Sequence, residues 1–268
     1  MTSTSPQYRN RVRIGRIWVD AVARAEALDT IRRLVETHQG GAVFTPNVDH
    51  ILMAETNREF RLAYRRASLV LADGVPIIWA SKLLGVPLPE KLSGSDMVLP
   101  IARLAASQRW RVYLLGGNSG VAKLAAERLS KRDGVLIVGV DDSFIRLESA
   151  DPEQRKVIGR IRDARPDLLF VALGAPKQEL WIARHRAELG PTVAVAVGAS
   201  LDFVAGTLRR APSWMSTAGL EWLYRLLQEP RRLWRRYLLR GPRAIPVLIR
   251  GMTSARTTRV WRQHAKNC

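Results

Sequence analysis

The chain has 268 residues, 47% of them hydrophobic and 25% charged, which is the composition of an ordinary globular protein with a sizeable core. Its 43 Lys and Arg residues against 24 Asp and Glu residues give a formal charge of +19, which predicts an anionic partner such as nucleic acid, a lipid surface or a phosphorylated substrate. The lone cysteine, Cys268, excludes an internal disulfide framework, and we expect neither a secretory signal nor a membrane-spanning segment.

Short apolar, β-branched runs alternate along the chain with stretches of helical periodicity. The runs that predict strands are 12–19, 41–44, 69–72, 110–115, 135–140, 167–173 and 192–197. Helices are predicted over 24–36, 48–66, 74–84, 95–106, 121–131, 152–164 and 177–188. This alternation predicts an α/β fold of the Rossmann-like kind, with a largely parallel sheet covered by helices on both faces.

Five of the predicted strands run directly into short polar loops. The loops read TPN, DG, GGNSG, GAPKQE and GASLD and begin at residues 45, 73, 116, 174 and 198. Parallel strands place such loops at one edge of the sheet, where open α/β folds bind their ligands. By itself Asp73 would be a turn residue and helix cap, but this convergence favours a functional role for its carboxylate.

The GGNSG loop, 116–120, lies between a predicted strand and a predicted helix. Glycines at this place let backbone amides approach a phosphate, so we expect Gly116, Gly117 and Asn118 to bind substrate. The loop matches neither the dinucleotide fingerprint nor a P-loop. The alternative is a glycine-rich turn with Ser119 as the helix cap.

Other loop residues have a functional and a structural interpretation. Thr45 and Asn47 can contact a sugar or a phosphate, or Asn47 can cap a helix. Lys177 and Gln178 suit an anionic ligand rich in hydroxyl groups, although surface residues would look the same. Asp202 can accept a hydrogen bond from a ribose hydroxyl or cap the following helix.

No metal site is predicted. A pair of aspartates spaced by one residue is lacking, and the adjacent Asp141 and Asp142 should point apart if the chain is extended there. The histidines show no metal-ligand spacing, so surface or packing roles are expected for His38, His50, His185 and His264. A nucleophilic triad cannot be assembled either.

Most of the excess charge lies near the C-terminus. Residues 205–268 hold 14 Lys and Arg against 2 Glu, so we divide the chain into an α/β domain, 1–204, and a helical basic appendage, 205–268. Amphipathic helices are predicted over 213–228 and 231–238. The arginines are too many to pair with the two acids. Two compatible roles remain for them, binding a diphosphate and attraction to anionic lipid.

Several ordered motifs between about residues 12 and 240 resemble the WecG/TagA/CpsF glycosyltransferases, also called glycosyltransferase family 26. They are TPNVDH, LADGVPI, EKLSGSD, LLGG, LGAPKQE, VGASLDFVAG, RAPSWMSTAGLEWLYRL and EPRRLWRRYL. The resemblance implies inverting, metal-independent transfer of a hexose-type sugar from a UDP-sugar to a polyprenyl-diphosphate-linked saccharide. It also implies a cytoplasmic enzyme on the inner face of a bacterial membrane, with its appendage against the lipid and no cofactor besides the UDP-sugar donor.

The resemblance also assigns roles to residues. Asp73 falls on the proposed general base, Thr45, Asn47 and Gln178 fall on other catalytic positions, and Asp202 falls on a uridine contact. The appendage arginines expected to face the diphosphate are Arg225, Arg232 and Arg235.

This chain departs from the family pattern at two places. Lys91 stands where the family often has arginine, so a forked donor becomes a point charge, which puts any diphosphate contact there in doubt. The loop after Val140 reads DDSF instead of an aromatic, glycine-containing sequence. Phe144 is the one aromatic residue in this loop that could pack on the base of the nucleotide.

Three questions stay open in the sequence. The transferred sugar can be N-acetylmannosamine, its uronic acid or glucose. Homo-oligomer formation and the role of residues 241–268 cannot be read from the sequence. Two rival functions are a basic nucleic-acid-binding protein, supported only by the charge, and a nucleotide-sugar enzyme of other chemistry such as a dehydrogenase, which the missing dinucleotide fingerprint disfavours.

Overall fold

The structure is a computed structural model. It describes residues 10–143, 145, 147, 152–212, 215, 220–228, 230–234 and 246–247. The predicted Phe144 contact lies outside these residues, as do Arg235 and nearly all of the segment from 235 onward.

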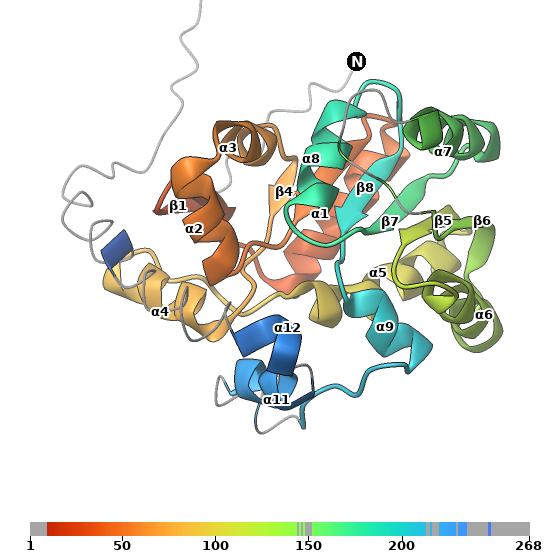
Figure 1. Ribbon diagram of the computed structural model, residues 1–268. Coiled ribbons are helices and arrows are strands. Elements are labelled where there is room, and N and C mark those ends of the chain that lie inside the picture. The colour runs from red at the N-terminus through yellow and green to blue at the C-terminus, as the bar shows by residue number, and fades with distance from the viewer. Residues whose placement is uncertain are drawn as a thin grey trace, which may run out of the picture.

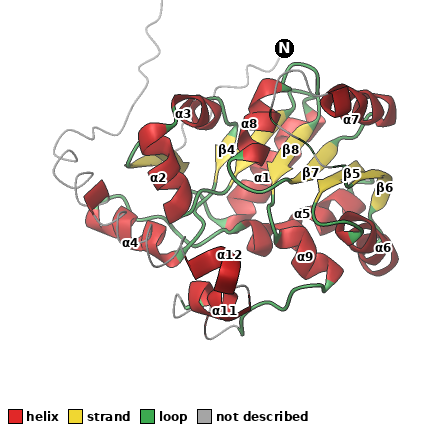
Figure 2. Ribbon diagram, in the orientation of Figure 1, coloured by secondary structure: helices red, strands yellow, loops and turns green. Residues whose placement is uncertain are grey.

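A six-stranded sheet forms the centre of the molecule, and every neighbouring pair in it is parallel. The strands are β3 (Gly41–Phe44), β4 (Leu69–Val70), β5 (Arg111–Gly116), β6 (Leu136–Asp141), β7 (Leu168–Ala172) and β8 (Val193–Ala196). Their order across the sheet is β4-β3-β8-β7-β5-β6 (Figure 2). All residues of β7 and β8 are buried, as expected for central strands covered on both faces.

Helices cover both faces of this sheet, and a separate apolar core fills each interface (Figure 1). One face carries α1 (Arg24–Glu36), α5 (Gly94–Ser107), α6 (Val121–Asp133) and α9 (Ser200–Ala205). The other face carries α2 (Val48–Thr56), α3 (Arg58–Arg65), α4 (Val75–Leu83), α7 (Pro152–Ala164) and α8 (Lys177–Arg184). The predicted α/β, Rossmann-like architecture is therefore confirmed.

The single strand predicted over 12–19 is wrong. This segment is an antiparallel hairpin of β1 (Arg11–Ile14) and β2 (Ile17–Asp20), which turns at Gly15, where φ is +56°. The buried apolar residues are Val12 and Ile14 in β1 and Ile17 and Val19 in β2, so the period of two breaks at Gly15 and Arg16, which was the signal for the turn. The buried Asp20 carboxylate accepts the N–H of Val70 at 2.8 Å and fastens the hairpin to β4.

The helix predicted over 48–66 is two helices. Asn57 ends α2 and starts α3, because its side chain accepts the N–H of Phe60 at 2.9 Å and satisfies one of the free amides of the new helix. An asparagine inside a periodic apolar pattern was the signal for this break.

Two short helices follow the α/β layers, α11 (Glu221–Gln228) and α12 (Pro230–Trp234), and in the view of Figure 1 they lie at the bottom, with α12 between α4 and α9. The predicted helices over 213–228 and 231–238 are described only in part. Our division after residue 204 falls one residue before the end of α9, where Gly206 adopts a left-handed conformation. Among the described residues, no helix is long and apolar enough to span a bilayer.

Candidate active site

Backbone hydrogen bonds join the loops that follow β3 and β4. The N–H of Asp73 donates to the carbonyl of Pro46 at 3.0 Å, and the N–H of Leu92 donates to the carbonyl of Ala72 at 2.7 Å. Asp73 is thereby held between the TPN loop and the segment that carries Lys91. The sequence prediction that these loops share one edge is confirmed for this part of the sheet.

The Asp73 side chain is partly exposed and does not cap α4. The N-cap of α4 is Gly74, at a φ of +108°, and no side chain hydrogen-bonds to the first turn. Desolvation raises the pKa of Asp73, the charge of Glu221 raises it further, and Lys91 and His50 oppose the shift. A carboxylate with a raised pKa is a stronger proton acceptor than an ordinary aspartate.

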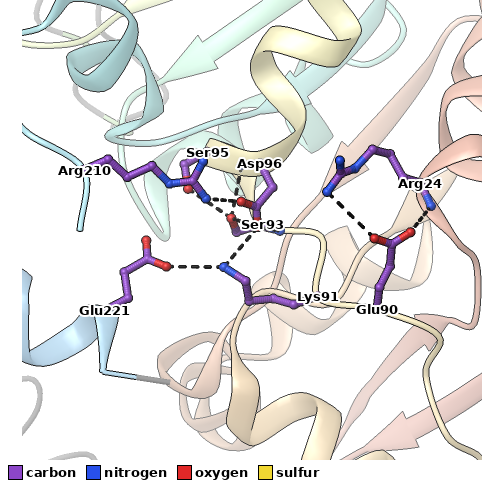
Figure 3. Close-up of polar contacts among 8 residues, drawn as sticks. All are labelled: Arg24, Glu90, Lys91, Ser93, Ser95, Asp96, Arg210 and Glu221. Carbon is purple, nitrogen blue, oxygen red and sulfur yellow. Dashed lines mark hydrogen bonds and ion pairs between the residues drawn. The ribbon is translucent and has the colours of Figure 1, made fainter. Parts of the chain in front are cut away.

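Charged residues from the appendage meet the start of α5 (Figure 3). Lys91 Nζ lies 3.0 Å from Asp96 Oδ2 and 3.3 Å from Glu221 Oε2. Arg210 contacts the other oxygen of Asp96, and the Ser93 hydroxyl donates to Asp96 Oδ2 at 2.6 Å. Lys91 therefore holds a bridging position between the α/β layers and the appendage.

The bonds within this group fix its charges. Although burial works in the opposite direction, Ser93, Lys91 and Arg210 lower the pKa of Asp96 to about 2. Desolvation also disfavours a charged Lys91, but Asp96 and Glu221 outweigh it and raise the pKa of the ammonium group. A persistent positive charge thus lies next to Asp73.

Thr45 is buried at the end of β3, where three elements approach closely. A Cβ placed on Gly94, the first residue of α5, would lie 3.1 Å from Ser200 Oγ and 3.5 Å from Thr45 Oγ1. Glycine at this position lets the N-terminus of α5 reach the loops after β3 and β8.

Asn47 and Gln178 are each held by their own side-chain bonds. Asn47 is the N-cap of α2, where its Oδ1 accepts the N–H of Asp49 at 3.0 Å, so the capping interpretation is confirmed. Gln178 is buried in α8, and its Oε1 accepts the N–H of Gly198 at 3.0 Å. Gln178 therefore ties the loop after β7 to the loop after β8, with Lys177 partly exposed at the helix start.

Asp202 is buried in α9, whose N-cap is Ala199, so Asp202 is not the cap. Its backbone carbonyl accepts the N–H groups of Thr207 and Leu208 at 3.0 and 3.3 Å. Asp202 therefore lies where the chain leaves α9 towards the appendage, next to the end of β8.

The glycines of the GGNSG loop already serve the fold. A Cβ on Gly116, whose φ is +90°, would lie 2.9 Å from the carbonyl carbon and oxygen of Ala172. The N–H of Gly117 donates to Ala172 O at 2.9 Å, and that of Gly120 donates to Asp142 Oδ2 at 3.0 Å. Gly120 and not Ser119 is the N-cap of α6, while the Asn118 residue is exposed.

Asp141 and Asp142 do not converge. Asp141 pairs with Arg160 at 2.7 Å and accepts the N–H of Ser143, whereas Asp142 turns to Gly120. Within the described part of the chain, no three His, Cys, Asp or Glu side chains gather as metal ligands.

The backbone of Arg225 lies on α11 and that of Arg232 on α12, whereas Arg235 is outside the described residues. Sequence reasoning assigned no role to Asp96, Arg210, Glu221 or Glu179 and expected only a surface or packing role for His50. The structure brings all five to this edge. The available signals were the SGSD capping pattern and the adjacent Gln178 and Glu179.

Comparison with known proteins gives a consistent result. The sequence model of the glycosyl transferase WecG/TagA/CpsF family matches residues 12–258. A relative from Bacillus spizizenii strain W23, named N-acetylglucosaminyldiphosphoundecaprenol N-acetyl-beta-D-mannosaminyltransferase, is 34% identical over 206 residues, which cover 76% of this chain and 77% of the relative. Proteins of the same name from Bacillus subtilis strain 168 and Staphylococcus aureus strain MW2 are 29% and 31% identical, over 81% and 72% of this chain and 82% and 74% of their own lengths. Because the match extends over most of its length, the chain belongs to the WecG/TagA/CpsF family of glycosyltransferases.

Proposed function

We propose that this protein transfers N-acetylmannosamine from a UDP-sugar to N-acetylglucosamine linked to a polyprenyl diphosphate. The names of the three relatives support this sugar and this acceptor. The observation that carries the proposal is the place of Asp73, a carboxylate of raised pKa at the carboxyl edge of the sheet with the ammonium group of Lys91 nearby.

In the proposed mechanism Asp73 is the general base. It accepts the proton of the acceptor hydroxyl while that oxygen attacks the anomeric carbon of the donor. The bond from the anomeric carbon to UDP breaks as the new glycosidic bond forms, and the bonding electrons leave with UDP. A single displacement of this kind inverts the anomeric configuration.

Cations stabilise the departing UDP in this proposal and no metal is needed. Lys91 and Arg210 turn from their carboxylate partners to the diphosphate, where they stabilise the negative charge that develops on the leaving group. The appendage arginines assigned to the same task are Arg225, Arg232 and Arg235.

Polar residues around the edge hold the rest of the donor. Asp202 accepts hydrogen bonds from the ribose or uracil, while Thr45, Asn47 and Gln178 contact the sugar. The remaining phosphate and hydroxyl contacts are assigned to the GGNSG loop and the start of α8, at Gly116, Gly117, Asn118 and Lys177. Because the Gly117 amide is already bonded, we assign the contact of that loop chiefly to the exposed Asn118.

We place the enzyme on the inner face of the cell membrane, held by its appendage. Trp222, Leu227 and Trp234 on α11 and α12 are 40%, 73% and 41% exposed, on a segment rich in arginine. Apolar side chains among cations suit an interface with anionic lipid, which is where a polyprenyl-linked acceptor lies. Binding to anionic but not neutral vesicles, lost when the chain is cut after residue 206, would support this placement.

The test uses the full chain with a short-chain polyprenyl-diphosphate N-acetylglucosamine. UDP-N-acetylmannosamine, UDP-N-acetylmannosaminuronic acid and UDP-glucose are offered in parallel, and products are identified by mass spectrometry and NMR of the anomeric proton. We expect one added N-acetylmannosamine with inverted configuration, formed equally well in EDTA. Transfer of another sugar would overturn the assignment of N-acetylmannosamine. Retention of configuration would overturn the single displacement, and loss of turnover in EDTA would overturn the metal-independent mechanism.

A further inference from the structure

A group of buried polar side chains lies beneath the proposed reacting edge. His50 of α2, Tyr64 of α3 and Glu179 of α8 are 5%, 4% and 1% exposed, and they adjoin Asn47 and Gln178. We call these five residues the buried polar cluster. The three helices that supply it lie side by side on one face of the sheet (Figure 1).

One end of the cluster fixes Asn47. His50 Nδ1 lies 2.8 Å from Asn47 Oδ1, which also accepts the backbone N–H of Asp49. The same Nδ1 accepts the backbone N–H of Asn47 at 3.3 Å, so the ring contacts both the backbone and the side chain of this cap residue. With its oxygen committed to α2, the side chain holds its amide nitrogen on the side away from that helix.

The other end fixes Gln178. Its Nε2 donates to Glu179 Oε1 at 2.8 Å, and its Oε1 accepts the N–H of Gly198 at 3.0 Å. Both ends of this amide therefore have partners, and the choice between its two flipped orientations is settled by Glu179 on one side and a backbone amide on the other.

His50 and Glu179 connect the two ends. His50 Nε2 lies 3.4 Å from Glu179 Oε1, within reach of an ion pair but outside hydrogen-bond geometry. Two more polar atoms of the cluster, Glu179 Oε2 and Tyr64 Oη, are buried with no hydrogen-bond partner among the described residues. A buried unpaired polar atom costs about 1–3 kcal/mol, so a fold that keeps several together calls for a functional reason.

The cluster also borders the proposed base. Burial raises the pKa of Tyr64 well above its usual value, and the charges of Glu179 and Asp73 add to this shift. Tyr64 is therefore near both carboxylates. Asn47 directly follows Pro46, whose carbonyl accepts the N–H of Asp73 at 3.0 Å.

We propose that His50 and Glu179 are positioning residues for sugar transfer, which act as one unit to orient Asn47 and Gln178 at the reacting edge. This inference rests on the proposed function, because it takes both amides as substrate contacts. Neither His50 nor Glu179 touches substrate. Misplacing a group that holds substrate by about 1 Å can lower the rate about 100-fold. Changes to a buried pair beneath such groups should therefore have a large effect on kcat.

The chain contains a matched control. His185 and Glu188 form a second His–Glu pair at 2.7 Å, next to the end of α8, with the Glu188 side chain 50% exposed. Glu188→Gln changes the same chemical group near the same helix but away from the cluster.

The experiment compares Glu179→Gln, His50→Asn, their double variant and Glu188→Gln in the full chain. Glu179→Gln keeps an oxygen for Gln178, and His50→Asn keeps a polar side chain next to Asn47, so both should fold, which circular dichroism checks. We expect kcat to fall about 10- to 100-fold in each single variant, the affinity for UDP to stay within twofold, and the double variant to fall little further. Glu188→Gln should match the parent protein.

A second readout needs no substrate. The side-chain amide NMR signals of Gln178, identified by their loss in Gln178→Glu, should shift in Glu179→Gln and in His50→Asn but stay in place in Glu188→Gln. If the parent enzyme transfers sugar and the cluster variants keep its kcat, the inference is overturned while the proposed function stands. If the parent enzyme transfers no sugar, the proposed function fails, and unchanged Gln178 signals would then reject the coupling separately. A kcat loss that simply multiplies in the double variant would show two independent residues and also overturn the inference.

Discussion

The two halves of the carboxyl edge of the sheet differ in how their polar groups are used. Around β3, β4, β7 and β8 the loops present side chains, among them Thr45, Asp73 and Gln178. The Asp73 backbone and the Gln178 side chain are held by hydrogen bonds to neighbouring loops. Around β5 and β6 the N–H groups of Gly117 and Gly120 in the GGNSG loop donate hydrogen bonds to Ala172 and Asp142. A glycine-rich loop at a strand end is therefore not by itself a ligand cradle, because close packing of neighbouring strands requires the same residues.

The largest expected effect is that of Asp73→Asn, which tests the first half. Asparagine keeps the size of the side chain but cannot accept a proton, so kcat should fall about 100- to 10,000-fold. Initial rates of UDP release and calorimetric UDP binding measure this, and UDP affinity should stay within a few-fold. Turnover near that of the parent protein would remove Asp73 from the role of base.

Gly116→Ala tests the second half as a question of packing. The new Cβ would strain a backbone at φ +90° and press on the Ala172 backbone, so we expect a loss of about 2–4 kcal/mol in the free energy of unfolding. Gly120→Ala is the matched control, because its φ is +78° but nothing lies within 4 Å of the added atom, and about 1 kcal/mol should be lost there. Equal losses in urea unfolding would contradict the packing explanation.

The pH dependence of kcat/KM is a second test of the role of Asp73. Its pKa is raised, so the base is lost as pH falls through a value above that of an ordinary aspartate, and kcat/KM should decline there. Glu221→Gln removes a negative neighbour and should move this decline to lower pH, whereas Lys91→Met removes a positive neighbour and should move it to higher pH. Shifts of the same sign in both variants would show that Asp73 does not set the profile.

The smallest effect is expected for Asp142→Ala. It removes an exposed hydrogen bond to the Gly120 amide, so about 0.5–1 kcal/mol of stability should be lost, with the transfer rate kept. Thermal unfolding and the UDP-release assay measure the two quantities. A large loss of turnover would mean that this loop contributes more to the reaction than its bonding indicates.

Local patterns in the sequence predicted the elements well where one period dominates. The bounds of β3 and α1 agree with the prediction because each is an uninterrupted pattern bordered by polar residues. The 12–19 hairpin was missed because the short interruption at Gly15 and Arg16 was passed over inside one apolar run. The break at Asn57 was missed because a capping side chain overrides helical periodicity.

The site was predictable only as far as topology places loops together. Asp73, Thr45 and Gln178 follow from strand ends in a parallel sheet. The contact between Lys91 and Glu221 joins residues 130 positions apart, and no local pattern reveals it. The pairing of His50 with Glu179 depends on how α2 packs near α8, which requires the tertiary structure.

The hydrogen bond from the edge strand β4 to Asp20 affects how readily copies of this protein aggregate at high local concentration. β4 lies at the end of the sheet, and an uncovered border strand invites another chain to add to it. The Asp20 carboxylate takes up the N–H of Val70, and the β1–β2 hairpin packs beside this strand. The flank nearest Asp73 is therefore guarded against intermolecular strand addition, so molecules can accumulate side by side without growing into fibres from that flank.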